Sequence, residues 1–185
     1  MANSETVSEA ISETMPETMS ETMSKNTTDE NLLSVNGTES HHEKPVDIRR
    51  SAMDLLARRE HSRLELARKL HKRFSQYETI EIVLDQLVQD QLLSDKRFTE
   101  AYVSYRKRAG FGPVKIASEL RERGINDTLA DKFLYQNSED WRATAAAAKQ
   151  KKFGANTAID LKEKLRQHRF LLYRGFRRHD FEDII

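Results

Sequence analysis

A helical spacing of apolar residues that returns every 45 to 50 residues is the feature that most constrains this chain. Residues four apart lie on the same face of an α-helix, so an apolar pair at this spacing marks the buried side of a helix. Three such pairs recur, 50 and then 45 residues apart: Leu66/Leu70, Ile116/Leu120 and Leu161/Leu165. We therefore predict a degenerate repeat in which each pair belongs to the second of three short helices. The alternative is an ordinary helical domain whose helices share a generic pattern.

Capping residues mark where the helices of the first repeat begin. Asp47 opens the first helical run, which is expected to end near Arg59. Ser62 has the capping-box spacing that begins a second helix, and Thr79 is expected to cap a third.

The second and third repeats follow the same plan. Asp95 is expected to cap the first helix of the second repeat, and Phe98 is expected to lie in its core. Glycine tolerates positive φ and proline favours the first turn of a helix, so these residues are expected to shape the turns. The turn positions are Gly110, Gly112, Pro113, Gly124 and Gly175.

The fold class that follows is all-α. Three tandem three-helix repeats, each helix-turn-helix-like, are expected over residues 47–94, 95–140 and 141–185. Repeats that contact only their neighbours build an elongated, curved solenoid with much exposed surface. Such a body is compatible with a chain that has only 37% hydrophobic residues.

The first part of the chain differs in composition from the rest. Residues 1–45 carry nine acidic and two basic side chains and no aromatic residue, whereas residues 46–185 carry 29 basic and 21 acidic ones. A tandem four-residue repeat of the Ser-Glu-Thr-Met type, between Ser12 and Met23, has too short a period for a packed unit. We predict a disordered, acidic, low-complexity tail over residues 1–46.

Composition also limits the compartment. The chain has no cysteine, which excludes disulfides and Cys-ligated metals. It has no stretch of about 20 apolar residues, the length that a membrane span requires. The acidic N-terminus is unlike a signal peptide. We therefore expect a cytoplasmic protein without membrane contact.

Motifs for catalysis are absent from the sequence. The turn at Gly110 lacks the third glycine of a dinucleotide fingerprint, and no phosphate-binding loop or zinc-protease motif is present. The carboxylate pairs Glu119/Glu122 and Asp180/Asp183 have helical spacing and are interpreted as solvated helix faces. We predict that the protein is not an enzyme and that it holds no cofactor or metal.

Basic side chains gather near the end of the first helix of each repeat. Two explanations account for this pattern equally well. The cations either compensate the helix dipole by position alone or form a cationic stripe that contacts a polyanion. Residues 141–185 favour the second reading, because they carry 11 basic and five acidic side chains. Phe170, Tyr173 and Phe176 interleave with these cations, a mixture that suits contact with phosphates and stacking on bases.

Several motifs in register resemble those of the RecX family, the bacterial regulatory proteins that act on the RecA recombinase. The resemblance covers about residues 47–185. The motifs are Arg58-Arg59-Glu60-His61-Ser62, Glu65-Leu66, Lys69-Leu70, Leu93-Ser94-Asp95, Arg97-Phe98, Gly110-Phe111-Gly112-Pro113, Ile116, Glu119-Leu120, Gly124-Ile125 and the segment from Arg169 to Phe176. The acidic tail departs from this pattern, because the family core usually starts close to its first helix.

The resemblance implies three tandem three-helix repeats and a regulator that acts by binding. Members are expected to lie in the groove of the RecA filament on single-stranded DNA. There they inhibit its recombinase, ATPase and co-protease activities in homologous recombination, DNA repair and the SOS response. The expected partners are the RecA filament and single-stranded DNA, with double-stranded DNA as a further candidate, and the protein is expected to be monomeric. A helix-turn-helix-type transcriptional regulator that reads duplex DNA is the alternative, and a pure protein scaffold is a third hypothesis.

The residues expected to contact RecA or DNA are basic and come from all three repeats. They are Arg58, Arg59, Arg97, Arg106, Lys107, Arg108, Lys115, Arg121, Arg123, Lys151, Lys152, Lys162, Lys164, Arg169 and Arg174.

Overall fold

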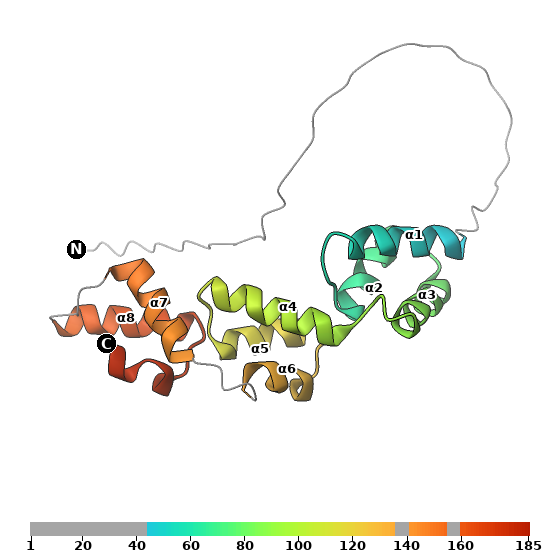
Figure 1. Ribbon diagram of the computed structural model, residues 1–185. Helices are drawn as coiled ribbons and strands as arrows, with labels where there is room; N and C mark the ends of the chain where they lie inside the picture. Colours follow the sequence, from blue (N-terminus) through green and yellow to red (C-terminus); the bar gives the residue numbers. More distant parts are fainter. Residues whose placement is uncertain (1–43, 136–140, 155–159) are drawn as a thin grey trace, which may run out of the picture. The chain divides into compact units, whose positions relative to one another are not determined.

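The computed structural model describes residues 44–135, 141–154 and 160–185. Over these ranges the secondary structure consists of eight α-helices and two short 3-10 turns, with no strand (Figure 1). The predicted all-α class is confirmed. The four-residue repeat and nearly all of the predicted tail lie outside the described residues, and the first helix already begins at Pro45. Every helix in the described ranges is too short or too polar to span a lipid bilayer.

The first helical group consists of α1 (Pro45–Leu56), α2 (Arg63–His71) and α3 (Tyr77–Gln89). Each of these helices packs against the other two. Their apolar stripes meet in a core that belongs to this group alone. Its buried members are Ile48, Ala52, Leu66, Ala67, Leu70, Ile80, Val83, Leu84, Leu87 and Leu93.

The second group consists of α4 (Asp95–Arg108), α5 (Pro113–Glu122) and α6 (Asp127–Leu134), which also pack against one another. The third group is less regular. It consists of α7 (Trp141–Phe153) and α8 (Leu161–Tyr173), followed by two 3-10 turns, η1 (Arg178–Asp180) and η2 (Glu182–Ile184). Helix α7 packs against α8 and η1.

The second and third groups share one hydrophobic core. Because apolar side chains of both groups are buried together, separating the groups would expose this core to water. Its buried members are Phe98, Tyr102, Val103, Phe111, Ile116, Leu120, Ile125, Ala130, Leu134, Trp141, Ala145, Ala148, Leu171, Phe176 and Phe181.

Two glycines allow these groups to meet backbone against backbone. The Gly112 amide donates to the Arg174 carbonyl oxygen at 2.8 Å, and the Val114 amide donates to the Gly175 carbonyl oxygen at 3.0 Å. A β-carbon on Gly112 would lie 2.4 Å from the Gly175 carbonyl, so no larger residue fits without displacement. Gly175 also has a φ of +85°, a conformation that glycine adopts without strain.

The helix caps agree with the sequence at one position and differ at three. Ser62 caps α2 by accepting from the Glu65 amide at 3.1 Å. For α4 the cap is Ser94 and not Asp95, because the extended backbone at Ser94 directs its hydroxyl to the Arg97 amide. Asp95, the first residue of the helix, instead accepts from the Arg63 amide at 2.7 Å and thereby contacts the start of α2.

The starts of α1 and α3 also lie earlier than predicted. Asp47 is inside α1, which begins at Pro45 because the fixed φ of proline suits the first helical turn. Thr79 is inside α3, where its hydroxyl donates to the Gln76 side chain at 3.1 Å.

One of the three apolar pairs on which the repeat was predicted is not buried. Leu66, Leu70, Ile116 and Leu120 are all 0% exposed. Leu161 and Leu165, by contrast, are 72% and 46% exposed. Helix α8 turns a different face inward, with Gln167 and Leu171 buried, so the prediction of a core role for the third pair is wrong.

Candidate functional site

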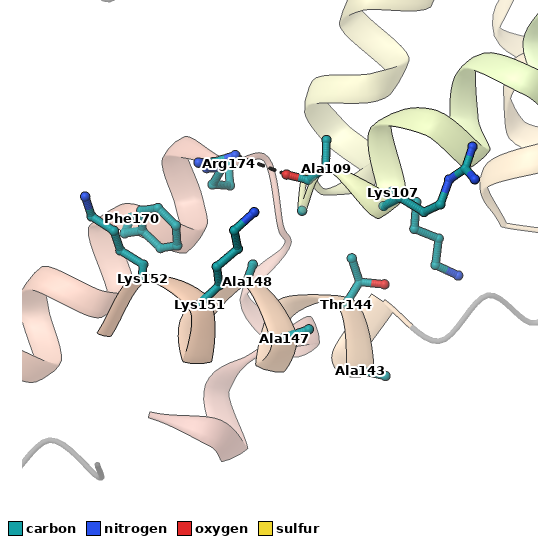
Figure 2. Close-up of a pocket in the computed structure, with 12 residues that line it drawn as sticks. Lys107, Ala109, Ala143, Thr144, Ala147, Ala148, Lys151, Lys152, Phe170 and Arg174 are labelled. Atoms are coloured by element: carbon teal, nitrogen blue, oxygen red, sulfur yellow. Dashed lines mark hydrogen bonds between the residues drawn. The ribbon is translucent and has the colours of Figure 1, made fainter. Parts of the chain in front are cut away.

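A hollow of about 600 Å³ lies where the end of α4 meets α7 and α8 (Figure 2). Among the described residues, its lining includes five cationic side chains and no carboxylate. The cations come from two helices, α4 and α7, and from the residue that follows α8: Lys107, Arg108, Lys151, Lys152 and Arg174. We call this surface the basic hollow.

Small residues form the floor of the basic hollow. Helix α7 is rich in alanine, the strongest helix former, and Ala143, Ala147 and Ala148 line the hollow. Gly110 lies so close to Ala148 that an added β-carbon would be 3.3 Å from the alanine β-carbon. This close approach brings the end of α4 to α7 and sets their cations around one concave surface.

Arg174 is a cation of the hollow that the fold holds in place. Its guanidinium lies 4.6 Å from the ring centre of Phe111 and 5.2 Å from that of Phe170. It also donates to the Ala109 carbonyl oxygen at 3.4 Å. Cation–π contacts and a hydrogen bond fix the guanidinium without neutralising its charge.

Lys151 and Lys152 are exposed cations of the same surface. Both side chains are exposed and neither forms an ion pair with a described residue. In Figure 2 they extend from α7 on the side of Phe170 and Arg174. A concave surface with several cations and no carboxylate among its described lining residues attracts anions and concentrates them locally.

A second cationic hollow, of about 560 Å³, lies along α8. It is lined by Lys162, Arg166 and Arg169 together with the exposed leucines Leu161 and Leu165. Lys164, on the same helix, is exposed as well. The two hollows differ in chemistry, because the second combines cations with solvent-exposed leucine side chains.

Arg106, which was expected to make contact, is part of the interior. Its side chain is only 15% exposed and is paired with Glu119, and its guanidinium lies 3.6 Å from the ring centre of Phe111. Tyr102 donates to the other oxygen of Glu119 at 2.9 Å. Burial and the charge of Glu119 raise the pKa of Tyr102 well above its usual range, so the phenol remains protonated. The interpretation of Glu119 as solvated is therefore wrong, because its charge balances the buried Arg106.

Asp180 is the second carboxylate that was wrongly assigned to a solvated face. It is 5% exposed, and it accepts from the Arg177 amide at 2.7 Å. This bond closes the 3-10 turn η1.

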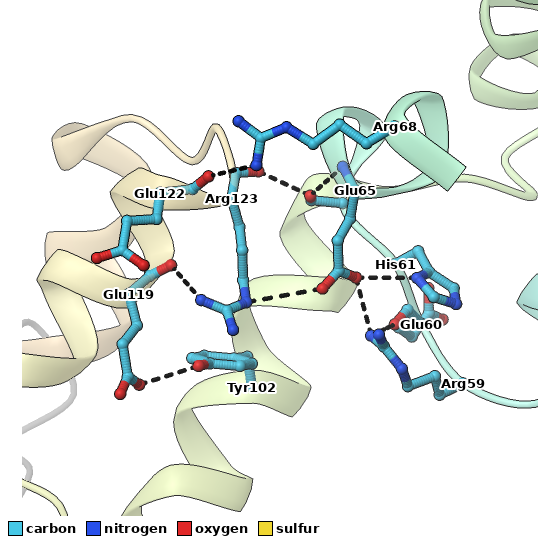
Figure 3. A network of polar contacts seen from close by, with 10 residues as sticks. Arg59, Glu60, His61, Glu65, Arg68, Tyr102, Glu119, Glu122 and Arg123 are labelled. Carbon is cyan, nitrogen blue, oxygen red and sulfur yellow. Dashed lines mark hydrogen bonds and ion pairs between the residues drawn. The ribbon is translucent and has the colours of Figure 1, made fainter. Parts of the chain in front are cut away.

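Polar contacts join the first and second groups (Figure 3), and we call them the polar seam. Arg123, at the end of α5, lies 3.7 Å from Glu65 of α2 and donates to the Glu119 carbonyl oxygen at 2.7 Å. Ser62 donates to the Arg123 carbonyl oxygen at 2.7 Å, and Arg68 donates to the Glu122 carbonyl oxygen at 3.0 Å.

Glu65 is the most constrained group of the polar seam. Burial opposes its ionisation, but hydrogen bonds with His61 and Arg59, together with their charges, outweigh burial and lower its pKa to about 2. The carboxylate is therefore ionised at neutral pH, and Arg59 is directed to it at 2.9 Å.

Other predicted contact residues are engaged within the protein. Arg97 pairs with Glu60 at 2.8 Å and donates to the carbonyl oxygens of Gln91 and Leu92. Arg121 pairs with Asp127 at 2.9 Å.

Ten of the predicted contact residues do not line the basic hollow. They are Arg58, Arg59, Arg97, Arg106, Lys115, Arg121, Arg123, Lys162, Lys164 and Arg169.

Lys115 belongs to an aromatic cluster beside the hollow. Its ammonium lies 4.9 Å from the ring centres of both Phe111 and Tyr173. Tyr173 is 73% exposed. This places one cation and one accessible aromatic ring where a base or a protein side chain can stack.

The arrangement suits the binding of a polyanion. Within the described ranges, no group of three or more His, Asp and Glu side chains is placed to hold a metal ion. The sequence located the cations but not the alanines of the floor, since alanine in a helix carries no signal of what faces it. The sequence also did not identify Glu65 and Glu119 as partners of arginines, because Arg106 and Arg123 come from other parts of the chain and Arg59 lies in the connection before α2.

This chain is similar in sequence to known proteins. Residues 94–134, which contain α4 to α6, match the family model described as RecX, second three-helix domain. The chain is 47% identical over 132 residues to the regulatory protein RecX of Pseudomonas syringae pv. tomato, covering 71% of this chain and 85% of that protein. It is also 47% identical over 131 residues to the regulatory protein RecX of Pseudomonas fluorescens, covering 71% and 84%.

Solved structures share the fold. A crystal structure of RecX from Lactobacillus salivarius superposes with a TM-score of 0.63 at 20% identity, covering 76% of this chain and 93% of that one. A second crystal structure of a regulatory protein RecX gives a TM-score of 0.59 at 21% identity, covering 75% and 71%.

Proposed function

The chain belongs to the RecX family of regulatory proteins, and from this membership we propose that it binds RecA filaments on single-stranded DNA and inhibits them. The activities that it restrains are ATP hydrolysis, strand exchange and the co-protease function of the filament. These activities serve homologous recombination, DNA repair and the SOS response. The protein acts by binding and not by catalysis.

The observation that carries the proposal is the basic hollow. Cations from three helical segments surround one concave surface, and no carboxylate lies among its described lining residues. Lysine and arginine at such a surface replace the counterions of a nucleic-acid backbone, which gives sequence-independent, salt-sensitive affinity. Phe170 lines the same hollow and offers an apolar surface beside the phosphates.

The residues that we propose as contacts are fewer than the basic residues expected from the sequence. Lys107, Arg108, Lys151, Lys152 and Arg174 contact the backbone of the nucleic acid in the basic hollow. Arg97, Arg106 and Arg123 support the fold through carboxylates and carbonyl oxygens. The proposed repeats over residues 47–94, 95–140 and 141–185 each contribute one helical group, and a monomer carries the whole surface.

The decisive experiment measures RecA ATP hydrolysis on single-stranded DNA while the full-length protein is titrated in. Hydrolysis is expected to fall as the protein is added, and to fall more steeply at low salt because the DNA contact is electrostatic. Unchanged hydrolysis at several-fold molar excess over RecA would count heavily against the proposal. In a parallel binding assay, strong preference for one duplex sequence would indicate a helix-turn-helix-type regulator instead.

A further inference from the structure

Helix α8 carries an exposed apolar stripe that neither the shared core nor the basic hollow uses. Leu161, Leu165 and Leu172 are 72%, 46% and 46% exposed. At about 100° per residue, these three positions fall within roughly 40° of one another around the helix. Tyr173, 73% exposed, lies about 100° from Leu172 around the helix and belongs to the cluster with Lys115, outside the stripe.

Leu161 and Leu165 of this stripe correspond, in the sequence repeat, to apolar pairs that are core residues in the other two groups. The apolar pairs of α2 and α5 are completely buried, whereas Leu161 and Leu165 of α8 face solvent. Helix α8 buries Gln167 and Leu171 instead. Single exposed leucines are common on protein surfaces, but an aligned set that a helix turns away from its own core marks a contact surface.

The charges beside the stripe have one sign. Lys162, Arg166 and Arg169 line the hollow of about 560 Å³ that also contains Leu161 and Leu165, and no carboxylate is among its described lining residues. Of these cations, Arg166 pairs with Glu163 at 3.0 Å and is 67% exposed. A partner for this face therefore has to present carboxylates and aliphatic side chains together.

The chemistry distinguishes this face from the basic hollow. A nucleic-acid backbone neutralises cations but offers little apolar surface to bury against leucine, and the bases of single strands stack mainly on aromatic rings. An amphipathic protein segment with apolar residues at helical spacing and acidic neighbours satisfies both the leucines and the cations.

We propose that the outer face of α8 is a protein-docking surface for an acidic, apolar segment of the partner. The proposal rests on the proposed function only in identifying this partner as a RecA subunit of the filament. The protein then contacts the filament through two chemically different surfaces. The basic hollow contacts the DNA, and α8 contacts the protein.

The test compares the full-length protein with the double variant Leu161→Ser/Leu165→Ser. The matched control is Ile82→Ser/Val88→Ser, which removes two exposed apolar residues of α3, 57% and 46% exposed. Affinity is measured for RecA filaments on single-stranded DNA and, separately, for the same single-stranded DNA alone. All replaced side chains are exposed, so both variants should keep the wild-type melting temperature.

The α8 variant is expected to lose affinity for the filament by about tenfold or more, because it no longer buries two leucine side chains against the partner. Its affinity for single-stranded DNA alone should not change, and the α3 control should match the wild type in both assays. Equal filament binding by the α8 variant and the wild type would overturn the proposal. An equal loss of affinity for DNA alone would also overturn it, because the face would then be a nucleic-acid site.

Three further outcomes complete the test. Concentration-dependent self-association of the wild type that the α8 variant abolishes would show that a second copy of this chain occupies the face, against the proposal. Wild-type protein without affinity for the filament would overturn both this inference and the proposed function. Filament inhibition by the wild type that the α8 variant fully retains would overturn this inference alone.

Discussion

Gly112 and Gly175 lie backbone against backbone: a β-carbon on Gly112 would come within 2.4 Å of the carbonyl carbon and oxygen of Gly175. Two hydrogen bonds between main-chain atoms cross this contact. The contact joins the second and third helical groups, which share one core. The position of α7 and α8 beside α4, and hence the basic hollow, depends on it.

Replacing Gly112 with alanine is expected to destabilise the protein by about 2–4 kcal/mol, because the new methyl group forces the two backbones apart. The matched control is Gly154→Ala. Gly154 has a φ of +81° but nothing within 4 Å of an added β-carbon, so only backbone strain of about 1 kcal/mol is expected there. Urea unfolding measures both. Equal losses of unfolding free energy in the two variants would contradict the role of close packing at Gly112, whose own φ is −90°.

Replacing leucine with alanine at equivalent places in α5 and α8 should give opposite results. Leu120→Ala removes a fully buried side chain and is expected to cost about 2–5 kcal/mol. Leu165→Ala removes a side chain that is 46% exposed and is expected to change stability by less than about 0.5 kcal/mol. Thermal unfolding followed by circular dichroism compares the two. A large loss in Leu165→Ala would mean that the third group buries its leucines after all.

The polar seam should make stability depend on pH through Glu65. Its pKa is lowered from 4.5 to about 2 in the folded protein, so the stabilisation is fully present above pH 4.5 and is lost as pH falls toward 2. Glu65→Gln is expected to cost about 1–3 kcal/mol at pH 7 and progressively less as the pH falls through that window. Urea unfolding at pH 7, 4 and 3 tests this.

Glu78→Gln is the control for this experiment, because Glu78 is exposed and forms no ion pair with a described residue. It should leave stability unchanged within about 0.5 kcal/mol at each pH. If Glu65→Gln and the wild type lose the same unfolding free energy between pH 7 and pH 3, the contacts of Glu65 do not stabilise its ionised form.

The lysines of the basic hollow should control affinity for single-stranded DNA. Lys151→Gln/Lys152→Gln is expected to weaken binding and to reduce the slope of log K against log salt by about 1.4, since each lost phosphate contact removes about 0.7 on single strands. Inhibition of RecA ATP hydrolysis should weaken in parallel.

Lys69→Gln/Lys72→Gln is the matched control for the hollow. It removes the same charge from two exposed lysines at the end of α2, far in sequence from the hollow lining. Its salt slope should stay close to that of the wild type. The same decrease of slope in both variants would indicate a general effect of net charge and not a site.

Sequence patterns predicted much of the fold because helix formation is mostly local. The cap at Ser62 and the buried face of α5 depend on spacing within a few residues, and these predictions agree with the structure. The error at Asp95 arose because two adjacent residues, Ser94 and Asp95, are both good caps. The backbone conformation decides between them, and the packing of α4 against the start of α2 gives Asp95 another partner.

The candidate site was predictable only in part. The sequence indicated an excess of cations after residue 141, and the hollow does contain Lys151, Lys152 and Arg174. It did not indicate which cations lie in the interior and which line the hollow. Arg106 and Lys107 are adjacent, yet Arg106 is turned inward to Glu119 while Lys107 lines the hollow.

The amino-acid sequence by itself determined the all-helical class, the family and the regions that are rich in cations, because periodicity, motifs and charge are properties of neighbouring residues. Only the tertiary structure decided which face of each helix is buried. Leu161 and Leu165 have the same spacing as Ile116 and Leu120, but the shared core accepts another face of α8. The backbone contact at Gly112 and Gly175 restricts how α8 approaches the second group, and burial follows from that approach.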